Sequence, residues 1–299
     1  MTQTALFDQL RSSIEHSCPV LPDKPEETSR RALECLWLMA AGQQRLLSGA
    51  DNRDLPELTS EQITRLRSLV ERRCSGIPLA HILGKQIFMG LEMLAGPEAL
   101  IPRKETELLG YKALSLLQAL VRERGEAKVL DVCTGSGNLA VSLARLESKC
   151  AVCASDVSSD AIALGKKNAE FHHVSDRVEF RVGDLFAPFP PEQFAHSFDL
   201  IVCNPPYISS AKVEKMAPEI AKFEPRAAFD GGPFGFGILS RLISEAPALL
   251  KPSSWLCFEL GLGQGPYLAK SVKASPHYSE VQTLTNETND IRGLAAKTR

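Results

Sequence analysis

Asn-Pro-Pro-Tyr at 204–207 directly follows the apolar run 198–203, which predicts a buried strand. Consecutive prolines hold φ at about −65° and lack N–H donors, so the strand must end there and leaves nearby carbonyl groups free for a ligand. The Asn204 side chain offers an acceptor and two donors, which suits a planar NH2 group such as that of a carboxamide or a nucleobase. The motif therefore indicates either an amine-binding site or a turn that binds nothing, because Asn and Pro are common in turns.

A second candidate site lies about seventy residues upstream, where a predicted strand at 128–133 passes through Asp131 into a loop of small residues and then a helix. Gly135 and Gly137 allow the backbone of such a loop to approach a ligand closely. Asp156 ends the next predicted strand, where doubly wound folds hold ribose hydroxyls. The glycine spacing also fits a loose dinucleotide fingerprint, but a hydride-transfer enzyme has no obvious use for an amide-binding site. Another ribose-bearing cofactor is therefore favoured.

Together these motifs resemble those of class I S-adenosylmethionine-dependent methyltransferases. More narrowly, they resemble the HemK/PrmC group, the protein glutamine methyltransferases that modify peptide-chain release factors. The motifs of this resemblance are Asp-x-x-Thr-Gly-Ser-Gly at 131–137, Asp156, Gly-Asp-Leu-Phe at 183–186, Asn-Pro-Pro-Tyr at 204–207, Ile-Pro-Arg-Lys-Glu-Thr-Glu at 101–107, Glu-Pro-Arg at 224–226, Phe-Asp-Gly-Gly at 229–232, Phe-Glu-Leu-Gly at 258–261 and Gln-Gly at 264–265. The likeness is strong from about Ile77 to the C-terminus and only architectural before it. Lys104 departs from the pattern, because the family usually carries a second proline there.

The resemblance implies S-adenosylmethionine as the cofactor, S-adenosylhomocysteine as its product, and no metal. It implies that Asp131 helps orient the glycine loop and the methionine part of the cofactor, that Asp156 accepts hydrogen bonds from the ribose, and that Asp184 and Leu185 bind the adenine. The expected cofactor-binding residues are Asp131, Cys133, Thr134, Gly135, Ser136, Gly137, Asp156, Asp184, Leu185 and Asn204. The alternative for Asp131 and Asp156 is that each caps the helix that follows it.

The resemblance also implies that the substrate is a glutamine side chain in the Gly-Gly-Gln segment of a release factor. We expect Asn204 Oδ1 and the Pro205 carbonyl to accept the two amide hydrogens, with Tyr207 packed against the amide plane. The expected catalytic residues are Asn204, Pro205, Pro206 and Tyr207, and the expected substrate-binding residues are Arg103, Glu105, Asn204, Pro205, Pro206 and Tyr207. Glu105 is also consistent with a role at the start of the next helix, where its charge favours the helix dipole. Glu259 is equally consistent with a functional and a structural role.

These residues need a framework of alternating strands and helices, which the sequence predicts from Glu105 onward. Expected strands lie at 128–133, 151–155, 177–181, 198–203 and 253–260, with terminal strands after a last helix. Such alternation indicates an α/β fold, with a parallel sheet covered on both faces. The resemblance adds a doubly wound, mostly parallel seven-stranded class I methyltransferase sheet whose last hairpin contributes one antiparallel strand.

The first part of the chain reads as a small helical domain. Thr59-x-x-Gln62 is a capping box that begins a helix running to about Arg73, and residues 27–47 predict another helix. A shorter helix is expected before the break marked by Pro19 and Pro22. The expected organisation is a helical substrate-recognition domain at 1–80, a connector with a β-hairpin at 81–104, and a methyltransferase domain at 105–299.

Composition restricts the partners. The chain has 299 residues and a net charge of −2, which argues against broad electrostatic binding to nucleic acid. It shows no signal segment and no apolar run of membrane-spanning length, so we expect a cytoplasmic enzyme with a release factor as partner, without membrane or direct nucleic-acid binding. Glutamine methylation of a ribosomal protein, N6-adenine methylation of nucleic acid and a cofactor-binding module without catalysis remain as alternatives.

Overall fold

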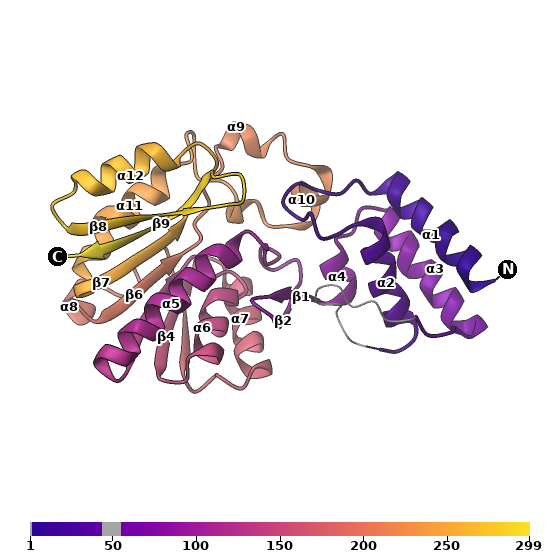
Figure 1. Ribbon diagram of the computed structural model, residues 1–299, viewed down its shortest axis with the longest axis horizontal. Helices are drawn as coiled ribbons and strands as arrows, with labels where there is room; N and C mark the ends of the chain where they lie inside the picture. Colours follow the sequence, from indigo (N-terminus) through magenta and orange to yellow (C-terminus); the bar gives the residue numbers. More distant parts are fainter. Residues whose placement is uncertain (1, 44–54) are drawn as a thin grey trace.

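The computed structural model describes residues 2–43 and 55–299, which form a bundle of helices beside a sheet covered by helices (Figure 1). The strands are β1 (Lys85–Phe88), β2 (Leu91–Leu94), β3 (Ala127–Val132), β4 (Cys150–Asp156), β5 (Val178–Val182), β6 (Phe198–Cys203), β7 (Leu250–Glu259), β8 (Tyr278–Thr285) and β9 (Ile291–Thr298). The helices are α1 (Gln3–Ser17), α2 (Ser29–Ala40), α3 (Ser60–Cys74), α4 (Leu79–Leu83), α5 (Thr106–Arg124), α6 (Asn138–Leu146), α7 (Ser159–Phe171), α8 (Pro191–Phe194), α9 (Ser210–Val213), α10 (Pro218–Phe223), α11 (Gly237–Glu245) and α12 (Gly265–Ala274), with 3-10 turns at Arg226–Ala228 and Ala246–Ala248. Within these described ranges, no helix is long and apolar enough to cross a membrane.

The large sheet has seven strands in the order β5-β4-β3-β6-β7-β9-β8. Strands β3 to β7 pair in parallel, and β9 runs antiparallel between β7 and β8. This arrangement confirms the expected doubly wound sheet with one antiparallel strand. The chain leaves β3 toward β4 and β5 and then returns to β6 on the other side of β3. The carboxyl ends of β3 and β6 therefore form the topological switch point, where open α/β sheets bind their ligands.

Both faces of the sheet are buried, as parallel pairing requires. Successive residues of β3 point to opposite faces, so Val129 joins a core with α5, α6 and α7, while Leu130 joins a core with α11 and α12. Both side chains are fully buried. This packing fixes the strand ends that carry Asp131 and Asn204.

The N-terminal helices pack around a separate apolar core that includes Leu33, Leu36 and Leu66. The predicted capping box is present, because Thr59 and Gln62 exchange side-chain and backbone hydrogen bonds at the start of α3. The first helix is not shorter than the next, since α1 has 15 residues and α2 has 12. Helix α2 ends at Ala40, and the part of the predicted helix at 44–47 lies outside the described residues.

The predicted hairpin is formed by β1 and β2, with Met89 and Gly90 in left-handed conformations at its turn. Its position is fixed by two contacts to helices that cover the seven-stranded sheet. Met89 N donates to Glu107 Oε1 on α5 at 2.7 Å, and Leu94 N donates to Asn168 Oδ1 on α7 at 2.7 Å. The hairpin is therefore packed on α5 and α7 rather than suspended between the two parts.

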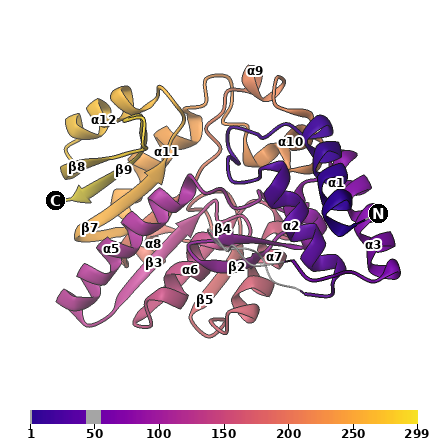
Figure 2. The ribbon, with the colours of Figure 1, turned by 45° about the vertical axis from the view of Figure 1, so that its right-hand side comes forward.

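The segment after Asn-Pro-Pro-Tyr was not predicted in detail. It forms the short helices α9 and α10 and reaches across to the N-terminal helices, as both ribbon views show (Figures 1 and 2). Arg73 on α3 donates to Glu219 on α10 at 2.8 Å, so the two parts of the molecule are in direct polar contact. Helices of four and six residues have too few turns to show an apolar period, which explains why the sequence pattern does not reveal them.

Candidate active site

Two cavities meet at Asn204, at the switch point of the sheet. One has a volume of about 230 Å³ and is lined by the glycine loop, Asp156 and the residues after β5. The other has a volume of about 660 Å³ and is lined by Pro205, Tyr207 and residues from the segment after them. Asn204 lines both cavities, and so does Arg103. A group bound in the first cavity can therefore face a group bound in the second across the Asn204 side chain.

The glycine loop needs glycine at two positions. Gly135 and Gly137 have φ values of +56° and +76°, which side chains rarely adopt. A Cβ atom on Gly137 would also lie 3.1 Å from the Phe180 ring. A Cβ atom on Gly135 would meet no atom within 4 Å, so the backbone there faces open space in the smaller cavity.

Asp131 holds this loop in place. Its Oδ2 accepts hydrogen bonds from Thr134 Oγ1 at 2.6 Å and from Ala140 N, in the first turn of α6, at 3.0 Å. The same oxygen therefore accepts one hydrogen bond from the glycine loop and one from a backbone N–H in the first turn of α6. Burial raises the pKa of Asp131 to about 7, although the bonds from Thr134 and Ala140 oppose the shift. The other oxygen, Oδ1, is buried without a hydrogen-bond partner among the described residues.

Asp156 is an acceptor on the wall of the smaller cavity. Its Oδ2 accepts from Gly135 N and its Oδ1 from Ser158 N, both at 2.9 Å. It does not cap α7, because Ser158 is the N-cap and accepts from Ala161 N at 3.1 Å. Burial raises the pKa of Asp156, and the backbone N–H donors oppose this shift. A carboxylate has about four acceptor positions, so two remain available for a ligand.

Asp184 and Leu185 follow β5 on the same cavity wall. The Asp184 carboxylate accepts from Arg241 Nη1 on α11 at 2.7 Å, so this acceptor is already shared with an exposed cation. Leu185 is buried with φ at +44°, and its carbonyl accepts from Ser155 Oγ at 2.9 Å. The left-handed backbone at Leu185 turns the chain beside the cavity.

Not all predicted cofactor-binding residues line this cavity. Those that line the smaller cavity are Cys133, Thr134, Gly135, Asp156, Asp184, Leu185 and Asn204. Asp131 and Ser136 are instead buried, and Gly137 packs against Phe180. These last three shape the loop from within the fold.

The Asn204 amide is held by a residue that the sequence did not point to. Its Nδ2 donates to Thr106 Oγ1, at the start of α5, at 3.1 Å. One of the two hydrogens of this NH2 group therefore fixes the Asn204 side chain to the protein. Oδ1 accepts no hydrogen bond within the described part of the chain and remains the acceptor available to a ligand.

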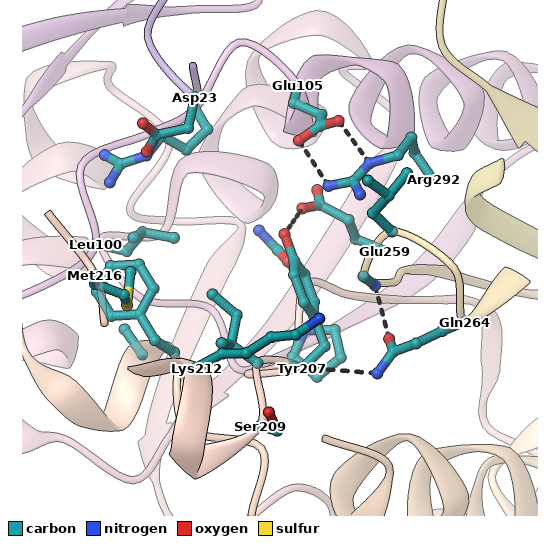
Figure 3. Close-up of a pocket in the computed structure, with 18 of the residues that line it drawn as sticks. Asp23, Leu100, Glu105, Tyr207, Ser209, Lys212, Met216, Glu259, Gln264 and Arg292 are labelled. Carbon is teal, nitrogen blue, oxygen red and sulfur yellow. Dashed lines mark hydrogen bonds and ion pairs between the residues drawn. The ribbon is translucent and has the colours of Figure 1, made fainter. Parts of the chain in front are cut away.

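Tyr207 lies at the edge of the larger cavity, in a network of polar side chains (Figure 3). Its hydroxyl donates to Glu259 Oε1 at 2.8 Å. Burial raises the pKa of Glu259 to about 7, while the hydroxyls of Thr106 and Tyr207 oppose the shift. Beside it, Arg292 donates to Glu105 Oε2 at 2.7 Å. Glu105 thus lines the predicted substrate cavity as one half of an ion pair.

Arg103 lines both cavities, and three of its five N–H donors are bonded within the protein. It donates to Asp23 Oδ2 at 2.8 Å, to Glu224 Oε1 at 2.6 Å and to Ile101 O at 3.0 Å. These bonds join the chain before α2, the segment before α5 and the segment after α10. Arg103 is therefore engaged within the protein, in addition to any contact with a substrate.

Sequence reasoning did not assign a role to two further residues of the site, Arg292 and Thr106. Arg292 belongs to a terminal strand and comes near Glu105 only through the antiparallel position of β9. Thr106 was seen only as part of a motif. In the residues that the structure describes, no group of three or more His, Cys, Asp or Glu side chains is arranged to hold a metal ion.

Comparisons with known proteins agree with this geometry. Residues 112–234 match the family model of the methyltransferase small domain, and residues 20–84 match that of the PrmC N-terminal domain. The hMettl16 catalytic domain, solved in complex with the MAT2A 3'UTR hairpin 6, has a TM-score of 0.54 at 15% identity and covers 84% of this chain and 86% of its own. That likeness concerns the fold alone.

Two relatives named release factor glutamine methyltransferase match most of the chain. The protein of Geobacter sulfurreducens is 39% identical over 270 residues, which is 88% of this chain and 88% of the relative. The protein of Chlorobaculum tepidum is 32% identical over 274 residues, which is 91% of this chain and 92% of the relative. With the sheet, the two cavities and the motifs in agreement, the chain belongs to the family of release factor glutamine methyltransferases.

Proposed function

We propose that this protein transfers a methyl group from S-adenosylmethionine to the side-chain amide nitrogen of a glutamine, in the Gly-Gly-Gln segment of a peptide-chain release factor. The observation that carries the proposal is the position of Asn204 between the two cavities. The names of the relatives from Geobacter sulfurreducens and Chlorobaculum tepidum support the same activity. A release-factor substrate would place the reaction in the cytoplasm.

The smaller cavity fits the proposed cofactor. Glu98, Asp156 and Asp184 line it together with Arg103, so acidic side chains outnumber basic ones among these four, which favours a molecule with a positive sulfonium group. The free acceptor positions of Asp156 suit ribose hydroxyls, and the open space beside Gly135 lets the backbone approach the ligand. S-adenosylmethionine, when bound, supplies an electrophilic methyl group.

The larger cavity supplies the other half of the reaction. An amide nitrogen is a poor nucleophile because its lone pair is delocalised into the carbonyl, so the protein must align it and hold its hydrogens. Asn204 Oδ1 and the Pro205 carbonyl are the acceptors proposed for those hydrogens. They stabilise the positive charge that develops on the nitrogen during transfer. Alignment alone can supply up to about 7–11 kcal/mol of the barrier reduction.

We further propose the division into a helical substrate-recognition domain at 1–80, a connector at 81–104 and a methyltransferase domain at 105–299. The separate apolar core of α1 to α4 supports a helical unit, although this core continues past residue 80 to Ile82 in α4. Residues that line the smaller cavity come mainly from the methyltransferase part, which leaves the helices free to hold the protein substrate.

The direct test incubates the purified protein with labelled S-adenosylmethionine and a full-length release factor. We expect one methyl group on the glutamine of Gly-Gly-Gln, located by mass spectrometry of the digested factor. A release factor with that glutamine replaced by glutamate is the matched control and should remain unlabelled. Ribosomal proteins and adenine-containing DNA serve as competing substrates. Labelling of either one without labelling of the release factor would overturn the proposal.

A further inference from the structure

One sequence motif has no part in the proposed transfer. Phe-Glu-Leu-Gly at 258–261, followed by Gln264, occupies the end of β7 and the turn into α12. This turn lies against the larger cavity, on the side where Tyr207 stands (Figure 3). Three residues of the motif contact Tyr207, each at a different part of it.

The hydroxyl, the ring and the carbonyl of Tyr207 are all engaged. Glu259 Oε1 accepts from the Tyr207 hydroxyl at 2.8 Å. Gly261 lies against the ring, since a Cβ atom there would come within 3.1 Å of Tyr207 Cδ2. Gln264 Nε2 donates to the Tyr207 carbonyl at 3.2 Å, while its Oε1 accepts from Gly261 N at 2.7 Å. These contacts leave the ring little freedom to rotate or translate.

Glu259 is an unusual residue for a purely structural site. Its side chain is almost fully buried, although ionised carboxylates are expensive to bury. The groups that face it are the hydroxyls of Tyr207 and Thr106 and the charges of Glu105 and Arg292. Arg292 is paired with Glu105, so the two hydroxyls hold Glu259, and that of Tyr207 donates to Oε1 at 2.8 Å. A leucine of similar size would fill this space without any desolvation cost.

We propose that Glu259 is a positioning residue for methyl transfer: by accepting from the Tyr207 hydroxyl, it fixes the Tyr207 ring as a wall of the amide site beside Asn204. Gln264 assists by holding the carbonyl of the same residue. The inference rests on the proposed function, because the ring is taken to pack against the substrate amide. Tyr207 donates its hydrogen to the protein, so its hydroxyl is oriented away from the role of substrate donor.

A double-mutant cycle with Glu259→Leu and Tyr207→Phe tests this inference in single-turnover methylation. Each variant should lower the rate roughly tenfold, while the KM for the release factor and the affinity for S-adenosylmethionine stay within about twofold, since a buried hydrogen bond is lost away from both ligands. The double variant should be no slower than the slower single variant, because both changes break the same bond. Glu259→Gln keeps an acceptor oxygen and should recover most of the rate.

A second readout does not depend on activity. The chain has four tyrosines, so fluorotyrosine labelling gives few resonances, and the one lost in Tyr207→Phe belongs to Tyr207. We expect that resonance to be shifted and broadened in Glu259→Leu, and to remain sharp in Glu259→Gln. If Glu259→Leu does not fold, Glu259→Ala takes its place in the same comparison.

Multiplicative rate losses in the double variant, or an unchanged Tyr207 resonance in Glu259→Leu, would overturn the inference. A raised KM with an unchanged single-turnover rate would do so as well. The proposed function fails separately, if the unmodified protein does not label the glutamine at all. In that case the resonance measurement still decides whether Glu259 holds Tyr207.

Discussion

At the scale of single residues, the Asp156 carboxylate has one structural and one proposed ligand-binding role. It accepts from the backbone of Gly135 and is also the proposed acceptor for the ribose. Asp156→Ala should therefore weaken S-adenosylmethionine binding by about 1.5–3 kcal/mol, the typical contribution of a hydrogen bond to a charged group. Calorimetry measures the affinity. Asp184→Ala is the matched control, and should cost less because that carboxylate is exposed and shared with Arg241. Equal affinities of folded Asp156→Ala and unmodified protein would contradict the ribose assignment.

The buried carboxyl group of Glu259 should make the free energy of unfolding depend on pH. Its pKa is raised by burial from 4.5 to about 7, so the folded protein binds a proton between these values that the unfolded chain has released. The free energy of unfolding must then fall as pH rises from about 4.5 to 7, by up to about 3 kcal/mol for this group. Asp131 adds a fall in the same direction. Glu259→Gln should be less sensitive to pH across this range in denaturant titrations. An identical pH dependence in the variant and the unmodified protein would refute the raised pKa.

At the scale of elements, α10 and the residue after it carry buried contacts between the two parts of the molecule. Glu224, just after α10, accepts from Arg103 at 2.6 Å and lies 3.5 Å from Lys24, and all three side chains are buried. Glu224→Ala would leave both cations without this partner, which should cost about 3–5 kcal/mol of stability. Arg226→Ala is the control, because Arg226 and its partners Glu214 and Asp230 are more exposed, and it should cost much less stability than Glu224→Ala. Chemical denaturation of both variants measures the difference, and similar losses would contradict the buried-network account.

The elements also show how far the sequence could predict the structure. The strands of the sheet and the capping box at Thr59 were predictable because each has a local signal, an apolar run or a fixed spacing of polar residues. Helix α10 was not, because its place is set by Arg73, Lys24 and Arg103, which come from distant parts of the chain. The same reason applies within the site. Asn204 stood out through its motif, whereas Arg292 reaches Glu105 across 187 positions of sequence.

At the scale of the whole molecule, we expect removal of the N-terminal helices to separate substrate recognition from cofactor binding. A protein beginning near Gln86 should still bind S-adenosylmethionine but should not methylate a full-length release factor. It should also be less stable, because Glu219 loses Arg73 and Lys24. A short peptide with Gly-Gly-Gln controls for folding, since the truncated and full-length proteins should methylate it at similar rates. Normal methylation of the intact factor by the truncated protein would show that the helices do not hold the substrate.

The central claim is that Asn204 orients the amide nitrogen between the two cavities, and single-turnover methylation by Asn204→Ala tests it most directly. The fold should persist, because the prolines at 205 and 206 still end β6, and cofactor affinity should remain close to normal. The rate on a release factor with its Gly-Gly-Gln segment should fall by ~10²–10³, as commonly follows the loss of one preorganised polar contact. A rate near that of the unmodified protein would contradict the account.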